Sequence, residues 1–349
     1  FFAAKAQRTQ RKKWVLSGKT FAFFAPLRQM IVNPMLPMPV YIHAAAALGP
    51  HGDVTRPERR ALHGDPPPLE LKERVKEIVG VPLRQASHLV ELAAIGSQLC
   101  LKRLPYPAPE NTAVYLGTGL AEMRKNEAVF RQTMPPGPGL ASPFDFINAA
   151  NNMAAFYTAR LGNFRARNLT VSQEEFSFEW ALHLAAADVR SGEYRQVLVG
   201  GVDENFHPRI GHLLRISLRD DQPMGEGCGW LLLSADKAQA CGELVEVKRA
   251  ARNLDTAQVL HAAWRLWQQP GEALTLLPGL RIEPAEIQHL RQALPDLRVQ
   301  DYLSLCGGFH TAAAFGLAAL FDAPVTPGLF VHLNRDASGH ATLCAVRVF

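Results

Sequence analysis

The chain has 349 residues, of which 48% are hydrophobic and 20% are charged, so it is long enough to bury a large core and to form two fused lobes. Residues 1–29 carry seven Lys or Arg and no acid, and subtracting those seven from the net charge of +5 leaves −2 for residues 30–349. The body therefore offers no positive surplus for nucleic acid. No apolar run approaches the ~18–20 residues of a membrane span, so we expect neither a nucleic-acid nor a membrane partner.

The basic segment at the start is interpreted separately from the body. We expect residues 1–29 to be a disordered leader or a non-native extension, and a targeting peptide is the alternative, although Lys19 interrupts its apolar run. The five cysteines show neither CxxC pairs nor metal-like His/Cys spacing. That pattern favours buried thiols in a reducing compartment over disulfides or zinc. We therefore expect a cytoplasmic protein without a metal or cofactor.

Strand and helix patterns alternate along the rest of the chain. Short apolar runs bounded by turn residues predict strands over residues 40–47, 112–119, 169–171, 230–234, 244–250, 274–277, 302–305, 328–333 and 341–348. Apolar residues at helical spacing predict helices over residues 83–101, 142–160, 256–268 and 308–320, and one from about residue 176. Because strands alternate with helices twice over, we expect an α/β protein with two βα halves, residues 38–235 and 236–349.

Four stretches, in this order, resemble the β-ketoacyl synthase branch of the thiolase fold. They look like its first strand and turn, its nucleophile-elbow segment, its Gly-Glu-Gly strand, and its second-half helix headed by a catalytic histidine. The stretches are VYIHAAAALGPHG (40–52), LTVSQEEFSFEWALHLAAADVRSGEYRQVLVGGVDE (169–204), MGEGCGWLLLSADKAQACG (224–242) and CGGFHTAAAFGLAAL (306–320). The resemblance implies two pseudo-symmetric βα halves that form a layered α-β-α-β-α core.

The resemblance also implies that the family's catalytic residues are missing. Glu175 stands where the family has its Cys, Pro278 stands in place of the His of a His-Gly-Thr motif, and Leu305 replaces a Lys. His310 remains at the head of the second-half helix. A helix N-terminus satisfies a carboxylate as well as a thiolate, but a carboxylate is a much poorer acceptor of an acyl group. We interpret these four positions as a vestigial site.

A silent synthase-like subunit resembles the proteins called chain-length factors. The resemblance implies pairing with an active ketosynthase and contact with acyl carrier protein through that partner. It further implies a role in polyketide or fatty-acid elongation of the aryl-polyene type. One alternative is an acyl-thioester hydrolase or decarboxylase that uses Glu175 and His310 as an acid–base pair. Another is a homodimeric acyl-chain binding protein.

The predicted helix over residues 142–160 is the candidate for a tunnel or interface. Ser142 and Pro143 form a good helix start. Large residues recur at helical spacing, which fits either ordinary core or, by the resemblance, a dimer interface near the tunnel floor. The candidates are Phe146, Asn148, Asn152, Met153 and Phe156. Asn residues are unusual inside a helix, so we expect the asparagines to make buried or cross-interface hydrogen bonds.

Overall fold

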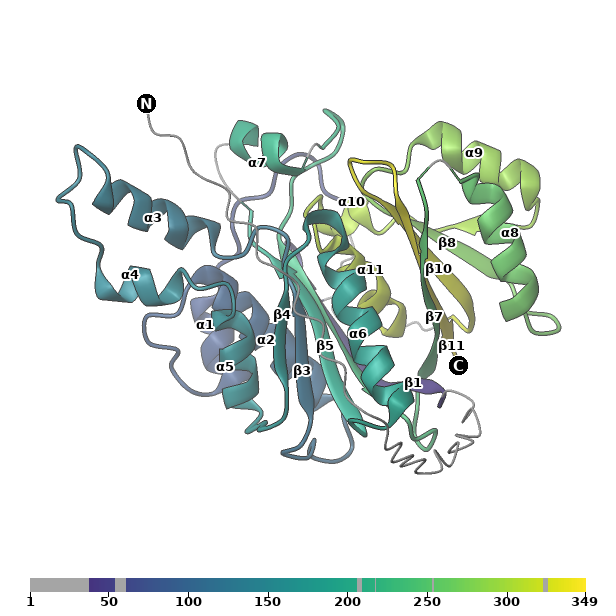
Figure 1. Ribbon diagram of the computed structural model, residues 1–349, viewed down its shortest axis with the longest axis horizontal. Coiled ribbons are helices and arrows are strands. Elements are labelled where there is room, and N and C mark those ends of the chain that lie inside the picture. The colour runs from purple at the N-terminus through teal and green to yellow at the C-terminus, as the bar shows by residue number, and fades with distance from the viewer. Residues whose placement is uncertain (1–37, 54–60, 206–208, 217, 253, 323–325) are drawn as a thin grey trace, which may run out of the picture. The chain divides into compact units, whose positions relative to one another are not determined.

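Eleven strands in one mixed sheet form the framework of the computed structural model, which describes residues 38–53, 61–205, 209–216, 218–252, 254–322 and 326–349. The leader interpretation of residues 1–29 lies outside the described residues. Figure 1 shows the helices arranged around this framework.

The first half of the sheet has the order β4-β3-β5-β6-β1. β3 is parallel to both β4 and β5, whereas β6 is antiparallel to β5 and β1. A short strand, β2, pairs with the end of β1. The bounds are β1 Val40–Gly49, β2 Gly52–Asp53, β3 Ala113–Gly117, β4 Asn168–Val171, β5 Gln196–Asp203 and β6 Gly227–Ser234.

The second half repeats this arrangement. Its order is β7-β11-β10-β8-β9, with the same sequence of antiparallel and parallel neighbours when read outward from its first strand. The first strands of the two halves, β1 and β7, pair antiparallel, with Tyr41 opposite Glu243. The bounds are β7 Gly242–Ala250, β8 Leu274–Pro278, β9 Arg298–Val299, β10 Gly328–Arg335 and β11 Ala341–Val348. The two pseudo-symmetric halves are those of a thiolase-like fold.

The helices form three layers, each with its own apolar cluster. α6 (Ser177–Ser191) and α11 (Ala312–Ala318) lie in the middle and pack against inward-facing residues of both half-sheets. α2 (His88–Lys102) and α5 (Met153–Leu161) cover the outer face of the first half. α8 (Thr256–Trp267) and α9 (Pro284–Ala293) cover the outer face of the second half. The α-β-α-β-α layering follows from this distribution.

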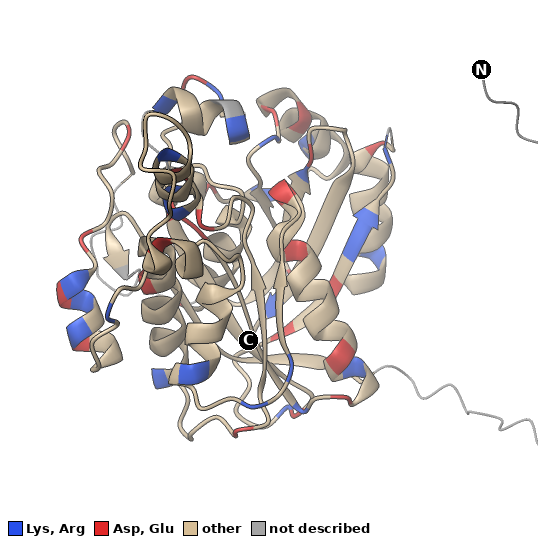
Figure 2. Cartoon of the chain, turned by 60° about the vertical axis from the view of Figure 1, so that its left-hand side comes forward, with Lys and Arg blue, Asp and Glu red and all other residues tan. Residues whose placement is uncertain are grey.

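The remaining helical elements are short or lie at the periphery. They are α1 Lys72–Arg74, the π-helical η1 Val75–Val79, α3 Met123–Thr133, α4 Pro143–Asn148, the 3-10 turn η2 Glu174–Phe176, α7 Arg209–Ile216, α10 Leu303–Cys306 and the 3-10 turn η3 Ala319–Phe321. Lys and Arg are interspersed with Asp and Glu on the described elements (Figure 2), in line with the modest charge of the body.

Two sequence-based expectations about elements are wrong. The helix expected over residues 142–160 is two helices, α4 and α5, because the Asn148 side chain donates to the carbonyls of Phe144 and Gln85 and ends α4 there. The strand expected over residues 302–305 is helix α10, because the Asp301 carboxylate accepts hydrogen bonds from the N–H groups of the first turn. The other predicted strands and helices are present, most of them with shifted ends, and β11 has the predicted bounds. The proposed division between residues 235 and 236 falls in the turn between β6 and β7 and stays a prediction.

Candidate functional site

The turn after β4 brings Glu175 to the start of the central helix α6. Glu174 in this turn has a φ of 45°, in the left-handed region that non-glycine residues rarely adopt. The Ser177 hydroxyl accepts a hydrogen bond from the N–H of Gln173 at 2.8 Å and donates one to the carbonyl of Glu174 at 2.7 Å. These bonds hold the turn closed, and Glu175 is only 2% exposed.

An arginine from the other half neutralises Glu175. The Nε and Nη2 atoms of Arg281, which follows β8, donate to Glu175 Oε1 at 2.8 and 2.6 Å. An unpaired carboxylate would pay a desolvation penalty of several kcal/mol here, because its side chain is 3% exposed. The elbow therefore holds an ion pair at the position where, by the resemblance, the family has its Cys. Sequence reasoning missed Arg281, although it is the one charged residue in the apolar stretch 273–282.

A buried polar network lies next to this ion pair. The Asn334 side-chain amide donates to the carbonyl of Glu175 at 2.9 Å and to Glu179 Oε1 at 2.7 Å. Burial raises the pKa of Glu179 to about 8, against the lowering effect of the Asn334 hydrogen bond. Burial also lowers the pKa of His332 to about 3, and its Nε2 lies 2.9 Å from the Tyr302 hydroxyl. Both Glu179 and His332 are therefore neutral near pH 7.

The corresponding turn of the second half places His310 just before α11. Asp203 at the end of β5 anchors this turn: its Oδ2 accepts from the Thr311 N–H and hydroxyl, and its Oδ1 accepts from Thr118 and from the Gly119 N–H. His310 packs so closely on Gly119 that a Cβ at residue 119 would lie 2.3 Å from His310 Nδ1. His310 is 2% exposed, and neither ring nitrogen has a hydrogen-bond partner among the described residues.

The other two positions of the predicted vestigial site, Pro278 and Leu305, form no polar cluster with these residues. Pro278 lines a cavity of about 390 Å³ together with Leu280 and Gly308. Leu305 is half-buried in α10 and packs against the central apolar cluster. Within the described ranges, no hydrogen bond joins Glu175 to His310, because the Glu175 carboxylate faces Arg281 instead. The acid–base pair of the hydrolase alternative gains no support from this geometry.

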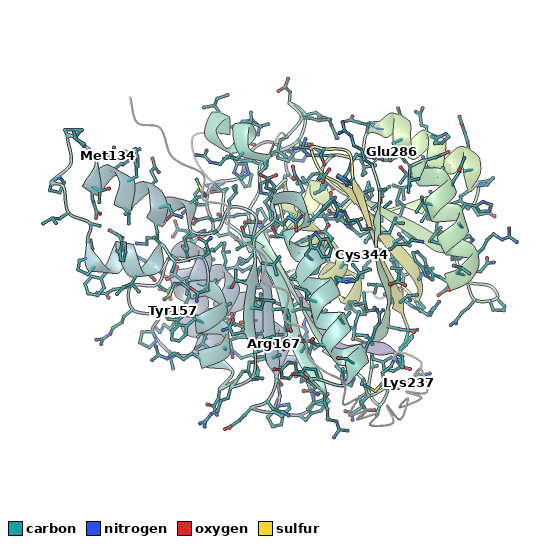
Figure 3. All side chains as sticks on the ribbon, viewed as in Figure 1. Met134, Tyr157, Arg167, Lys237, Glu286 and Cys344 are labelled. Atoms are coloured by element: carbon teal, nitrogen blue, oxygen red, sulfur yellow. The ribbon has the colours of Figure 1, made fainter. Side chains whose placement is uncertain are left out.

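The candidate interface residues lie on and beside a helical hairpin, residues 123–148, which we call the arm. α3 and α4 of the arm lie away from the sheet in Figure 1, and Met134, labelled in Figure 3, marks its tip. Asp145 holds the two helices together by accepting from Lys125 and Gln132, each at 2.8 Å. α3 has no buried residue. The arm therefore has its own internal bonds but little core.

The arm and the adjoining helix α5 expose large apolar side chains. Phe146 is 67% exposed and Phe156 is 47% exposed. Asn148 is buried and bonded within the chain, Met153 is half-buried against the outer cluster, and Asn152 is exposed. The exposed apolar residues of the arm are Phe130, Met134, Leu140, Phe144, Phe146 and Ile147.

The Gly-Glu-Gly motif has a structural role. Glu226 is buried and accepts hydrogen bonds from the Leu69 N–H at 2.5 Å, His88 at 3.0 Å and the Asn205 N–H at 3.1 Å. Its carboxylate thereby joins the loop at Leu69, the start of α2 and the segment just after β5. In the part of the chain that the structure describes, no group of His, Cys, Asp and Glu is suited to hold a metal ion. None of the helices described there is both long and apolar enough to cross a membrane.

Comparisons with known proteins agree with this architecture. Residues 82–216 match the family model of the beta-ketoacyl synthase N-terminal domain. No curated protein matches the sequence.

Three solved structures have similar folds at low sequence identity. The ishigamide ketosynthase/chain length factor is 20% identical, with a TM-score of 0.71 over 89% of this chain and 99% of that one. A type II polyketide ketosynthase in complex with its acyl-carrier protein is 14% identical, with a TM-score of 0.69 over 90% and 100%. A beta-ketoacyl synthase from Burkholderia phymatum is 14% identical, with a TM-score of 0.66 over 89% and 100%. The chain therefore has a thiolase-like fold, and its residues 82–216 are similar to the beta-ketoacyl synthase N-terminal domain.

Proposed function

We propose that this protein is a catalytically silent chain-length factor that pairs with an active ketosynthase. It would act during polyketide or fatty-acid elongation of the aryl-polyene type, with acyl carrier protein engaged through the partner. The observation that carries the proposal is the Glu175–Arg281 ion pair at the elbow. A carboxylate locked by a guanidinium cannot serve as a thiolate does in accepting an acyl group.

The rest of the former site supports a silent role. General acid–base chemistry requires groups within hydrogen-bond reach of one another or of the substrate. Pro278 and Leu305 supply no titratable group, and His310 has no bonded partner among the described residues. One substitution at Glu175 would therefore not restore condensation.

The exposed arm supports pairing with another subunit. An apolar surface of this kind on a monomer marks an interaction site when its residues are contiguous. Phe146 of the arm and Phe156 of α5 expose large apolar side chains, and β4 is the edge strand of the first half-sheet. We expect the pairing interface to be larger than the ~1,200–2,000 Å² of a standard complex. Two of the similar structures are a ketosynthase/chain length factor and a ketosynthase in complex with its acyl-carrier protein.

Co-expression with a ketosynthase that has an intact Cys-His-His set tests the proposal. We expect a stable heterodimer that extends an acyl chain with malonyl units carried on acyl carrier protein, with release of CO2, whereas the isolated chain and its Glu175→Cys variant make no condensation product. Condensation by the isolated chain at the rate of the complex would refute the silent role.

The interface is tested by charge insertion with a matched control. Phe146→Glu should weaken synthase binding by at least about tenfold, because a carboxylate would be buried in an apolar contact. Leu266→Glu makes a comparable change on α8, where Leu266 is 81% exposed, and should leave binding unchanged. Equal binding by both variants, or a chain that stays monomeric beside the synthase, would contradict the pairing.

A further inference from the structure

An open groove lies on the outer side of the first half, between the helical segment α1–η1 and the chain that leads into α2. Its volume is about 490 Å³, within the range of roughly 300–1,000 Å³ that small-molecule pockets occupy. The groove shares no lining residue with the elbow or with the exposed apolar residues of the arm. A ligand bound here is therefore independent of the proposed pairing.

Unusual backbone conformations shape this groove. η1 is a single π-helical turn, closed by a hydrogen bond from the Gly80 N–H to the carbonyl of Val75 at 3.1 Å. Gly80 has a φ of 75°, which turns the chain back toward α2. Gln85, also in the lining, has a φ of 63°, in the left-handed region that non-glycine residues rarely adopt. Because π-helical turns and backbone outliers gather at functional sites, this region is a candidate for ligand binding.

The floor of the groove is apolar and part of it is open to water. Val75 is 5% exposed and belongs to the outer apolar cluster, and the half-buried Leu83 and Ala86 pack against the same cluster. Val81, which is 49% exposed, and the exposed Pro82 continue this surface to the rim. An alkyl chain laid along these side chains would remove apolar surface from water on both partners, which is favourable.

Two lysines and one acid line the groove beside this floor. Lys72 and Lys76 are four residues apart, so they lie on one face of the helical segment. Both are exposed, and within the described ranges neither ammonium group has a hydrogen bond or an ion pair. Burial raises the pKa of Glu91, which projects from α2, and the charges of His88 and Lys72 oppose that rise. With Glu91 ionised, the two ammonium groups and one carboxylate leave a single net positive charge.

Charge and shape together specify the ligand. A monovalent anion neutralises the groove, whereas a cation would be repelled and an uncharged chain would leave the lysines unmatched. We propose that this groove binds a medium-chain fatty acid, with its carboxylate at the two lysines and its alkyl chain on the apolar floor.

Calorimetric titration of the full-length protein with sodium octanoate at pH 7 tests the ligand class. Binding should saturate with a Kd of roughly 0.1–1 mM, as expected for a ligand of this size. Each methylene removed from the chain should weaken binding roughly two- to fourfold. Octanamide keeps the chain without the charge and should bind about tenfold more weakly than octanoate. Equal affinity for octanamide, or for acetate, would refute the proposal.

Two variants of the charged residues should change octanoate affinity in opposite directions. Lys76→Met should weaken binding about fivefold, because it removes an ammonium group, and Glu91→Gln should strengthen it, because it removes a like charge. Lys102→Met is the matched control: it changes an exposed lysine at the end of α2, outside the groove, and should bind like the parent. Equal affinity of Lys76→Met and Lys102→Met would overturn the site.

The methyl groups of Val81 report where the alkyl chain lies. In protein labelled with ¹³C at the valine methyl groups, the signals lost in Val81→Ala identify this residue. Saturating octanoate should shift these signals, and acetate should not. The signals of Val346, which is buried in the central cluster, should stay in place and serve as the control. Octanoate binding without a shift at Val81 would place the chain outside the groove and contradict the proposal.

Discussion

The two central helices of this protein begin in topologically equivalent turns that are stabilised in different ways. At the start of α6 a buried carboxylate, Glu175, is neutralised by Arg281 from the opposite half. At the start of α11 a buried imidazole, His310, has no bonded partner among the described residues, and Asp203 anchors the neighbouring Thr311. The topology therefore preserves the two turns while the chemistry at each can change.

The difference shows what a charge requires of its surroundings. An ionised group in a protein interior needs a countercharge, whereas a neutral imidazole is tolerated at the smaller penalty of unpaired polar atoms. The buried Glu175 carboxylate is therefore accompanied by an arginine that reaches it, whereas the buried His310 imidazole needs no countercharge.

Removal of Arg281, the countercharge of Glu175, should lower the free energy of unfolding more than the other changes considered. Arg281→Met leaves the Glu175 carboxylate buried and unpaired, so we expect the free energy of unfolding to fall by about 3 kcal/mol. Arg281 is 21% exposed, which allows some hydration and places the effect at the low end of the range for broken buried pairs. Urea denaturation followed by circular dichroism measures the change.

The double variant Glu175→Met with Arg281→Met is the matched control. It removes both charges, so its stability should lie within about 1 kcal/mol of the parent. If it is as unstable as Arg281→Met, the loss arises from packing of the arginine stem and the ion-pair interpretation is wrong.

A second test at the start of α6 concerns the protonation of Glu179. The Asn334 side chain links this residue to Glu175 by hydrogen bonds to both. The pKa of Glu179 is about 8 in the folded protein, above the ordinary value of 4.5, so the folded state binds the proton more tightly. The resulting stability is fully present below about pH 4.5 and is lost as the pH rises to about 8. Between pH 6 and pH 7.5 the parent should lose about 2 kcal/mol relative to Glu179→Gln.

Denaturation of both proteins across this pH range measures the difference. The subtraction isolates Glu179 from Glu122, whose pKa burial also raises to about 8. If the free energy of unfolding changes with pH in the same way in the parent and in Glu179→Gln, Glu179 is ionised in the folded protein and the prediction is wrong.

Substitution of His310 should change the free energy of unfolding least. His310→Leu replaces two unpaired polar atoms by apolar ones of similar size, so we expect a change in unfolding free energy within about 1 kcal/mol. Elongation by the complex with a ketosynthase should also stay unchanged. A loss of elongation with preserved stability and binding would assign His310 an active role.

Local patterns in the sequence determined most of the architecture. Apolar runs bounded by turn residues located the long strands, and the order of four motifs indicated the layered fold and the position of Glu175. Prediction from local patterns failed where a side chain forms hydrogen bonds with backbone groups and so starts or ends a helix. Asn148 splits the helix expected over residues 142–160, and Asp301 begins a helix where a strand was expected.

The tertiary structure alone decided what surrounds the elbow. Arg281 lies 106 residues along the chain from Glu175, and Asn334 lies 155 residues from Glu179. Helical or strand periodicity reports only which face of an element is buried, so it carries no information about which distant residue meets it. The sequence alone placed an acid, Glu175, at the elbow, whereas the fold brought the two halves together and thereby showed that Arg281 neutralises it in a buried ion pair.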